Sequence, residues 1–137
     1  MTTSGKKGGA DREPLRVLQL CAVDFTARQF VLPVARRLAR EGYEVTLACR
    51  KGDCWQDLEG KGVELVDLPM WRGGNPLGLL RALGALTVFL RRGRVDILHV
   101  HTPAAAPAGR MAAFLARTPR VVYTVHGFYF HDGAPPL

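Results

Sequence analysis

The sequence predicts an α/β protein with a single Rossmann-like domain, in which a parallel sheet carries helices on both faces. Short apolar segments alternate along the chain with segments of helical periodicity, as expected for parallel strands joined by helices. The first apolar segment, residues 15–21, is nearly continuous, which is typical of a strand buried on both faces. A chain of 137 residues with 47% hydrophobic residues has the size and composition for one such domain.

The residues before the first strand and the cysteines indicate where the protein resides. Residues 1–14 are rich in Gly, Lys and Ser and have no apolar segment, so we predict a disordered leader that is neither a signal peptide nor an anchor. The domain is then expected over residues 15–137. The three cysteines, Cys21, Cys49 and Cys54, form no CxxC pair, which favours a reduced, cytoplasmic compartment. We expect Cys21 and Cys49 to lie in the core.

The net charge of +7 favours anionic partners such as nucleotides, phospholipid head groups or nucleic acid. No basic stripe interleaved with aromatic residues is visible, so we expect no nucleic-acid partner. The apolar residues 77–90 would rise about 21 Å as a helix, short of a hydrocarbon core of roughly 30 Å. We predict that this helix packs on the sheet. The arginines that follow, at residues 91–94, leave open a peripheral contact with the inner face of the cell membrane.

The first helix is expected after a loop at residues 22–25. Thr26 is predicted to cap it, and it should run to about residue 41. Pro33 lies inside this segment, which predicts a kink or a late helix start, because an interior proline costs about 3 kcal/mol. The face that we expect to be buried carries apolar residues four positions apart: Phe30, Val34 and Leu38.

The remaining elements follow from the same periodicities and from the turn residues between them. They are strands at residues 43–49, 63–68, 95–101 and 120–126, and helices at residues 53–59, 77–92 and 104–117. Right-handed crossovers with a switch after the third strand give the sheet order 3-2-1-4-5. Ligands of open α/β sheets bind where the strand order reverses, here between the carboxyl ends of the first and fourth strands.

Histidines stand at the ends of two strands that reach this edge. Residues 95–101 end in His99-Val-His101, directly before Thr102-Pro, and we expect His99 to be buried and hydrogen-bonded and His101 to lie on the rim. Residues 120–126 end in His126, and the glycine that follows it allows a ligand to approach closely. A histidine in this place can donate or accept a hydrogen bond to a ligand. A purely structural role for His126 remains the alternative.

Other chemistries of this fold class are disfavoured by particular residues. His99 and His101 share one strand face, but no carboxylate or cysteine follows closely, so we predict no metal site. A dinucleotide-binding half would need G-x-G-x-x-G after the first strand, and residues 21–28 contain no glycine. Thr26 and the amides after it could still meet a phosphate at the helix start. A phospho-acceptor domain would need clustered acids, which Asp24 alone does not supply.

Three segments carry a resemblance to a known family. They are residues 95–103, the Gly109-Arg110 pair, and residues 123–131, which include Thr-Val-His-Gly-Phe. Together they resemble the N-terminal acceptor domain of family-4 glycosyltransferases with the GT-B fold, in the bacterial branch that builds exopolysaccharide and other cell-surface glycans. The resemblance covers residues 15–137. It implies that this chain is the partial N-terminal half of a GT-B fold.

The resemblance implies a retaining glycosyltransferase that transfers a sugar from a nucleotide-sugar to a glycan or lipid-linked acceptor. No cofactor is implied, because the nucleotide-sugar acts as a co-substrate. The histidine before glycine lies beside the transferred sugar in the family, so His126 is the expected catalytic residue. The expected substrate-binding residues are Asp24, Thr26, His101, Thr102 and Gly127. A non-catalytic Rossmann-like binding or interaction module is the alternative from another class.

The chain departs from the family pattern in two places. Many members carry a Gly-Gly pair in the first loop that contacts the donor phosphate, whereas this chain has Val-Asp-Phe-Thr at residues 23–26. In the family a C-terminal domain binds the nucleotide-sugar and supplies the carboxylates of a Glu-x7-Glu motif, and this chain ends at Leu137 before any such domain. We therefore expect an incomplete domain that is inactive by itself.

Overall fold

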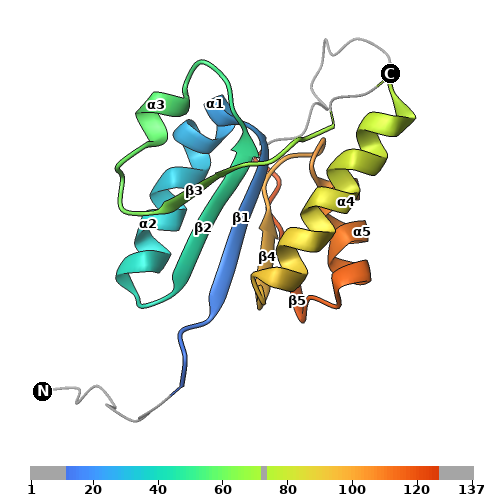
Figure 1. Cartoon of the computed structure of the whole chain (residues 1–137). Helices are drawn as coiled ribbons and strands as arrows, with labels where there is room; N and C mark the ends of the chain where they lie inside the picture. The colour runs from blue at the N-terminus through green and yellow to red at the C-terminus, as the bar shows by residue number, and fades with distance from the viewer. Residues whose placement is uncertain (1–11, 72–73, 127–137) are drawn as a thin grey trace, which may run out of the picture.

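A computed structural model describes residues 12–71 and 74–126. Five parallel strands form one sheet in the order β3-β2-β1-β4-β5, with helices on both faces (Figure 1), which confirms the predicted fold and strand order. The strands are β1 (Arg16–Val23), β2 (Glu44–Arg50), β3 (Glu64–Asp67), β4 (Ile97–Val100) and β5 (Arg120–Tyr123). Of the predicted leader, residues 12–14 have no regular secondary structure, and residues 1–11 lie outside the described residues.

The helical segments lie in two groups on opposite faces of the sheet. They are α1 (Asp24–Thr26), the π-helical turn η1 (Ala27–Val31), α2 (Leu32–Arg40), α3 (Trp55–Leu58), α4 (Pro76–Arg92) and α5 (Ala106–Ala116). Segments α1 to α3 cover one face, and α4 and α5 cover the other (Figure 1). All five predicted strands are present, but the predicted first helix is divided into α1, η1 and α2, and the fifth strand ends at Tyr123, before His126.

Alternate residues of β1 supply both halves of the core. Leu18 and Leu20 pack with residues of α4 and α5, whereas Val17 and Cys21 pack toward α2 and α3. Cys21 and Cys49 are completely buried, which confirms their expected place in the core. A hydrogen bond with Cys49, together with burial, raises the pKa of the Cys21 thiol, so this thiol stays protonated.

The first helix begins earlier than predicted and contains a wide turn. Helical structure starts at Asp24, and the Thr26 side chain makes no capping hydrogen bond, so the predicted cap was wrong. The N–H of Leu32 donates to the carbonyl of Ala27, five residues back. Pro33 then stands in the first turn of α2. A proline has no N–H and clashes with the carbonyl four residues before it, and a π turn accommodates both effects.

This wide turn also changes which face of the helix is buried. Val31 and Ala35 are buried, whereas Phe30 and Val34 are 47% and 38% exposed. The predicted stripe at Phe30, Val34 and Leu38 was therefore wrong for its first two members. Its spacing assumed 3.6 residues per turn throughout, and the π turn adds a residue at the point where the stripe begins.

Helices α4 and α5 pack side by side on the other face. The side chain of Asn75 accepts a hydrogen bond from the N–H of Leu77 (2.9 Å) and so caps α4. The predicted packing of α4 on the sheet is confirmed, because Ala82, Leu86 and Leu90 are buried in the core. Within the described residues, no helix has both the length and the apolar content to cross a bilayer.

Candidate functional site

The candidate site lies at the carboxyl edge of the sheet, between β1 and β4. These two strands are parallel neighbours, with Leu20 beside Val100. After β1 the chain enters α1 on one face, and after β4 it turns toward α5 on the other. This is the reversal of strand order at which open α/β sheets bind ligands.

Thr102 ties the two diverging segments together. Its Oγ1 accepts hydrogen bonds from the N–H of Ala22 (3.1 Å) and from the N–H of Ala105 (3.3 Å). One bond fixes the end of β1 against the turn after β4, and the other closes the turn that leads into α5. The hydroxyl oxygen of this predicted substrate-binding residue thus has a structural role, and its half-buried side chain lies at the switch point.

Three histidines form a row along this edge. The Nδ1 of His101 lies 3.0 Å from the Nε2 of His126, and the rings stack with centroids 5.3 Å apart. The His99 ring lies against the ring of His101, with centroids 3.9 Å apart, and its Nε2 is 2.7 Å from the Oγ1 of Thr124. The parallel pairing of β4 with β5 brings His126 to this place from 25 residues away.

Neither of the first two histidines has the burial expected for it, although His99 does form the expected hydrogen bond. His101, predicted on the rim, is only 2% exposed, whereas His99 is half-buried. His101 is enclosed because Gln19 of β1 contacts its Nε2 and His126 contacts its Nδ1. Burial, together with the neighbouring imidazoles of His99 and His126, lowers the pKa of His101 to about 3. The pKa of His99 is lowered for the same reason, so both rings are neutral at neutral pH.

His126 is the exposed end of the row. Its ring stacks on Phe30 of η1 with centroids 5.1 Å apart, and its Nε2 lies 3.0 Å from the Nδ1 of His101. These two contacts hold an exposed imidazole in a defined orientation at the switch point. Gly127, the predicted substrate-binding residue after it, lies outside the described residues.

The residues of the first loop have a different role from the predicted one, because Asp24 contacts the loop after β2. Asp24 is only 6% exposed, and its carboxylate accepts a hydrogen bond from the N–H of Cys54 (2.8 Å). A Cβ atom on Gly52 would lie 2.7 Å from the Oδ1 of Asp24, so this carboxylate fills the space beside the loop after β2. Asp24 therefore braces that loop, while Thr26 is half-buried on α1.

Two residues of the site were missed in the sequence. The helical spacing predicts Phe30 in the core, and only the proline three positions later indicates that the helix is irregular there. Gln19 is completely buried and contacts His101, and the signal was a single amide in an otherwise apolar strand. The part of the chain that the structure describes contains no group of three His, Cys, Asp or Glu side chains that could hold a metal ion.

Comparison with known proteins identifies relatives of the chain. Residues 26–137 match the family described as glycosyl transferase 4-like domain. The UDP-Gal:alpha-D-GlcNAc-diphosphoundecaprenol alpha-1,3-galactosyltransferase of Escherichia coli is 32% identical over 96 residues, 69% of this chain and 25% of that protein. EpsD of Bacillus subtilis (strain 168), which is named as a glycosyltransferase, is 30% identical over 122 residues, 88% of this chain and 31% of that protein. The chain thus spans between a quarter and a third of these relatives.

Among solved structures, a glycosyltransferase from Rickettsia africae has a similar fold. The two superpose with a TM-score of 0.68 and 20% sequence identity, over 89% of this chain and 32% of that protein. The similarity shows that the five-stranded sheet is the Rossmann-like arrangement found in GT-B glycosyltransferases.

Proposed function

Because the chain belongs to the glycosyl transferase 4-like family, we propose that it forms the N-terminal, acceptor-binding part of a retaining glycosyltransferase. The donor is a nucleotide-sugar and the acceptor is a glycan or a lipid-linked sugar. The name of the Escherichia coli relative, which pairs UDP-galactose with a sugar on diphosphoundecaprenol, supports this choice of substrates. We also propose that residues 1–137 alone transfer no sugar, because they correspond to only 25% and 31% of the two relatives that are named as glycosyltransferases.

The observation that carries the proposal is the exposed imidazole of His126 at the switch point. Phe30 and His101 hold this ring in a fixed orientation. A ring nitrogen so placed can hydrogen-bond the transferred sugar and stabilise charge that develops as the donor bond breaks. Thr102, Thr26 and Gly127 border the same substrate, and Asp24 contributes by fixing the loop beside it.

The test uses the protein expressed from its complete coding sequence. Turnover is measured with a panel of radiolabelled nucleotide-sugars and a bacterial lipid extract as acceptor. Replacing His126→Ala removes an interaction made mainly in the transition state, so turnover should fall on the order of a hundredfold, with little change in melting temperature. Near-normal turnover of this variant would return His126 to a structural role. Absence of any transfer by the unchanged protein would favour the non-catalytic binding module.

A peripheral contact with the cytoplasmic membrane surface belongs to the same proposal, and the charge distribution supports it. Residues 12–71 carry nine basic and nine acidic side chains, whereas residues 74–126 carry seven arginines and one acid, Asp96. The half that contains α4 and α5 therefore holds nearly all of the net positive charge. Anionic lipids attract such a surface by about 1 kcal/mol for each Arg or Lys close to it.

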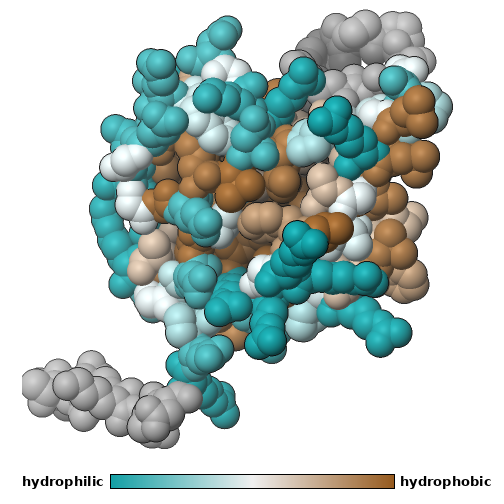
Figure 2. All heavy atoms as spheres, in the orientation of Figure 1, coloured by the Kyte–Doolittle hydropathy of each residue, from teal (hydrophilic) through white to brown (hydrophobic). Residues whose placement is uncertain are grey.

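The same half exposes large apolar side chains. We call these residues the α4–α5 outer face: Leu77, Leu80 and Val88 of α4, with Met111, Phe114 and Leu115 of α5. Figure 2 shows brown atoms gathered along the side of the molecule that these helices form. Phe114 is 79% exposed and Leu77 is 73% exposed. Apolar side chains next to basic ones are typical of a surface that enters the head-group region of a bilayer.

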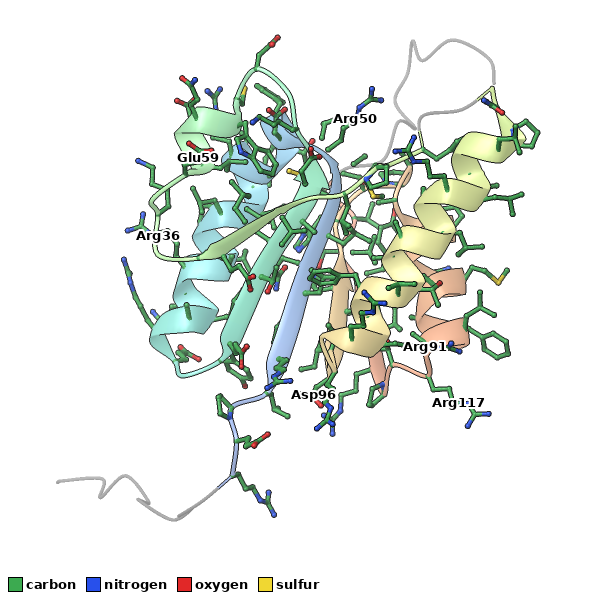
Figure 3. All side chains as sticks on the ribbon, viewed as in Figure 1. Arg36, Arg50, Glu59, Arg91, Asp96 and Arg117 are labelled. Carbon is green, nitrogen blue, oxygen red and sulfur yellow. The ribbon has the colours of Figure 1, made fainter. Side chains whose placement is uncertain are left out.

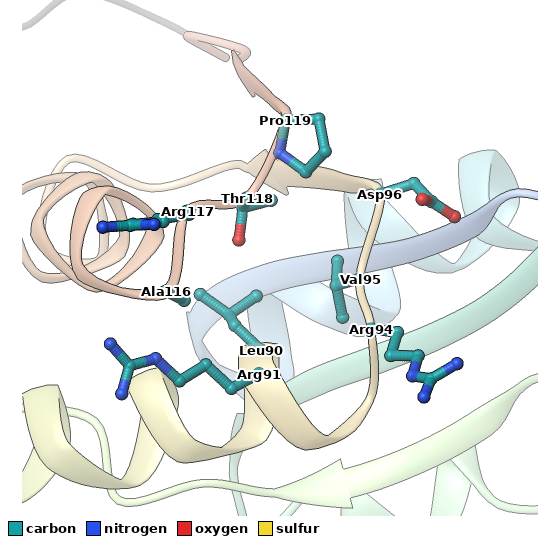
Figure 4. A pocket seen from close by; sticks show the side chains of 9 residues that line it. All are labelled: Leu90, Arg91, Arg94, Val95, Asp96, Ala116, Arg117, Thr118 and Pro119. Atoms are coloured by element: carbon teal, nitrogen blue, oxygen red, sulfur yellow. The ribbon is translucent and has the colours of Figure 1, made fainter.

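Arginines border this face where α4 and α5 end. Arg91 and Arg117 lie at the same end of the helix pair (Figure 3), and Arg91 donates a hydrogen bond to the carbonyl of Leu115 (2.7 Å). A hollow of about 280 Å³ lies between these ends, lined by Arg91, Arg94 and Arg117 among others (Figure 4). The single acid beside it, Asp96, accepts a hydrogen bond from the N–H of Arg16 (2.8 Å). The arginines around this hollow add positive charge beside the apolar face.

A further inference from the structure

Buried polar side chains are few among the described residues, and two of the three touch each other. They are Gln19, completely buried, His101, 2% exposed, and Asp24, 6% exposed. A buried amide in a central strand is costly unless it forms hydrogen bonds. The Oε1 of Gln19 faces the Nε2 of His101, while its own Nε2 has no partner within residues 12–71 and 74–126. Burying Gln19 with its amide nitrogen unpaired costs stability, and within the described residues the one polar contact of its side chain is with His101.

The contacts define where the protons lie. The Oε1 of Gln19 can only accept, so the Nε2 of His101 carries the hydrogen and donates it. His101 is neutral and has a single N–H, so its Nδ1 is a bare acceptor. The Nδ1 lies 3.0 Å from the Nε2 of His126, which must therefore carry the hydrogen of that bond. The Nδ1 of His126 is then the nitrogen left for a substrate.

We propose that Gln19 and His101 are positioning residues that hold His126 as its Nε2–H tautomer and aim its Nδ1 at the substrate. The proposal rests on the proposed function, because it assigns the orientation of the imidazole that faces the sugar. When His126 is neutral, its Nδ1 accepts a hydrogen bond from a sugar hydroxyl. When His126 takes up a proton at Nδ1, its Nε2–H still donates to His101, so the same ring orientation serves both protonation states.

His99 provides a matched control inside the same row. Its ring lies 3.9 Å from that of His101, as measured between centroids, but its Nε2 bonds to Thr124 and not to Gln19 or His126. We call the two hydrogen bonds between Gln19 and His101 and between His101 and His126 the relay. Replacing His99 therefore disturbs the packing around His101 without removing a hydrogen bond of the relay. If the three histidines only stabilise the fold, replacing His99 should lower turnover as strongly as replacing His101.

The first measurement is independent of any enzymatic activity. In the ¹⁵N-labelled chain, a coupling through the hydrogen bond between Nδ1 of His101 and Nε2 of His126 is expected in side-chain NMR spectra. The ¹⁵N shifts of both rings should indicate the Nε2–H tautomer. The coupling should persist in His99→Asn and disappear in Gln19→Leu. A spectrum of the unchanged chain that shows no coupling, or Nδ1–H on His101, would overturn the relay.

The second measurement uses sugar transfer by the complete protein. His101→Leu removes the acceptor for His126 and should lower kcat about tenfold with little change in KM, as losing an orienting partner typically does. His101→Asn places an amide oxygen near the position of Nδ1 and should restore most of the turnover, while His99→Asn should keep it. Equal turnover of His101→Leu and the unchanged protein would refute the positioning role. If instead His126→Ala is fully active while the NMR coupling is present, the proposed function fails and the relay stands.

Discussion

His101 occupies an environment far from that of a histidine in water. It is enclosed between an amide and two imidazoles, and within residues 12–71 and 74–126 no carboxylate contacts the ring to stabilise a positive charge on it. Burial therefore lowers its pKa from 6.5 to about 3. Its neighbour His126 is exposed and lies in the same hydrogen-bonded row. At the scale of single residues, His101 is neutral, and its unprotonated Nδ1 can accept a hydrogen bond from the ring of His126.

This shift predicts a pH dependence of stability. Between pH 6.5 and 3 the unfolded state binds a proton on His101 that the folded state does not. The contribution of this residue is therefore fully present above about pH 6.5 and is lost as the pH falls toward 3, with a slope of at most about 1.4 kcal/mol per pH unit. Urea unfolding of the unchanged protein and of His101→Asn, from pH 4 to 7, measures it. As the pH is lowered, the unfolding free energy of the unchanged protein should fall relative to that of His101→Asn. A constant difference between the two proteins would contradict the lowered pKa of His101.

At the scale of elements, the distance of a helix from the sheet depends on the residue that faces it. Gly109 of α5 lies against β4, where an added Cβ would be 3.0 Å from the Cγ2 of Val100 and 3.3 Å from the Cδ2 of Leu20. Gly84 stands on the exposed side of α4, with nothing within 4 Å of an added Cβ. Both glycines are interior helix positions, but only Gly109 permits a close approach.

The two glycines form a matched pair for a stability experiment. Gly84→Ala should stabilise the protein by about 1 kcal/mol, because alanine has the higher helix propensity and meets no neighbour. Gly109→Ala gains the same propensity but must displace Val100 and Leu20, so its unfolding free energy should fall below that of Gly84→Ala by about 1–3 kcal/mol. Thermal or urea unfolding of both variants decides this. Equal stabilisation by both would mean that α5 can move away from the sheet without loss.

At the scale of the whole molecule, charge and exposed apolar surface are unequally distributed. One half of the described chain is electrically balanced, and the other combines seven arginines with the α4–α5 outer face. The candidate site lies at the sheet edge between the two halves. A surface that holds the protein on a bilayer would keep this edge near lipid-linked substrates.

Vesicle binding measures this asymmetry directly. The chain should sediment with vesicles that contain phosphatidylglycerol and bind pure phosphatidylcholine at least tenfold more weakly, with the difference reduced at high salt. The double variant Leu80→Gln/Phe114→Gln should lose most of the binding. The control Phe25→Gln/Val34→Gln removes exposed apolar side chains from the balanced half and should bind normally. Equal binding of both double variants would contradict membrane docking through the α4–α5 outer face.

Sequence patterns alone predict the alternation of strands and helices, the strand order and the delivery of histidines to one sheet edge. These features follow from local periodicity and from the handedness of crossovers, both of which can be read along a single chain. The burial of Cys21 and Cys49 and the packing of α4 on the sheet follow from the same patterns. The resemblance to the family also depended on local segments, mainly the residues around His126.

The surroundings of each of these residues, in contrast, depend on how the strands and helices pack together. Gln19 and His101 are 82 positions apart, and their contact arises because β1 and β4 are neighbours in the sheet. That contact encloses His101, which the sequence had placed on the rim, and it leaves His126 as the exposed imidazole. The π turn before Pro33 likewise moved Phe30 from the expected core onto the ring of His126. Burial and side-chain partners depend on residues distant in the sequence, and a periodic pattern along one segment carries no information about them.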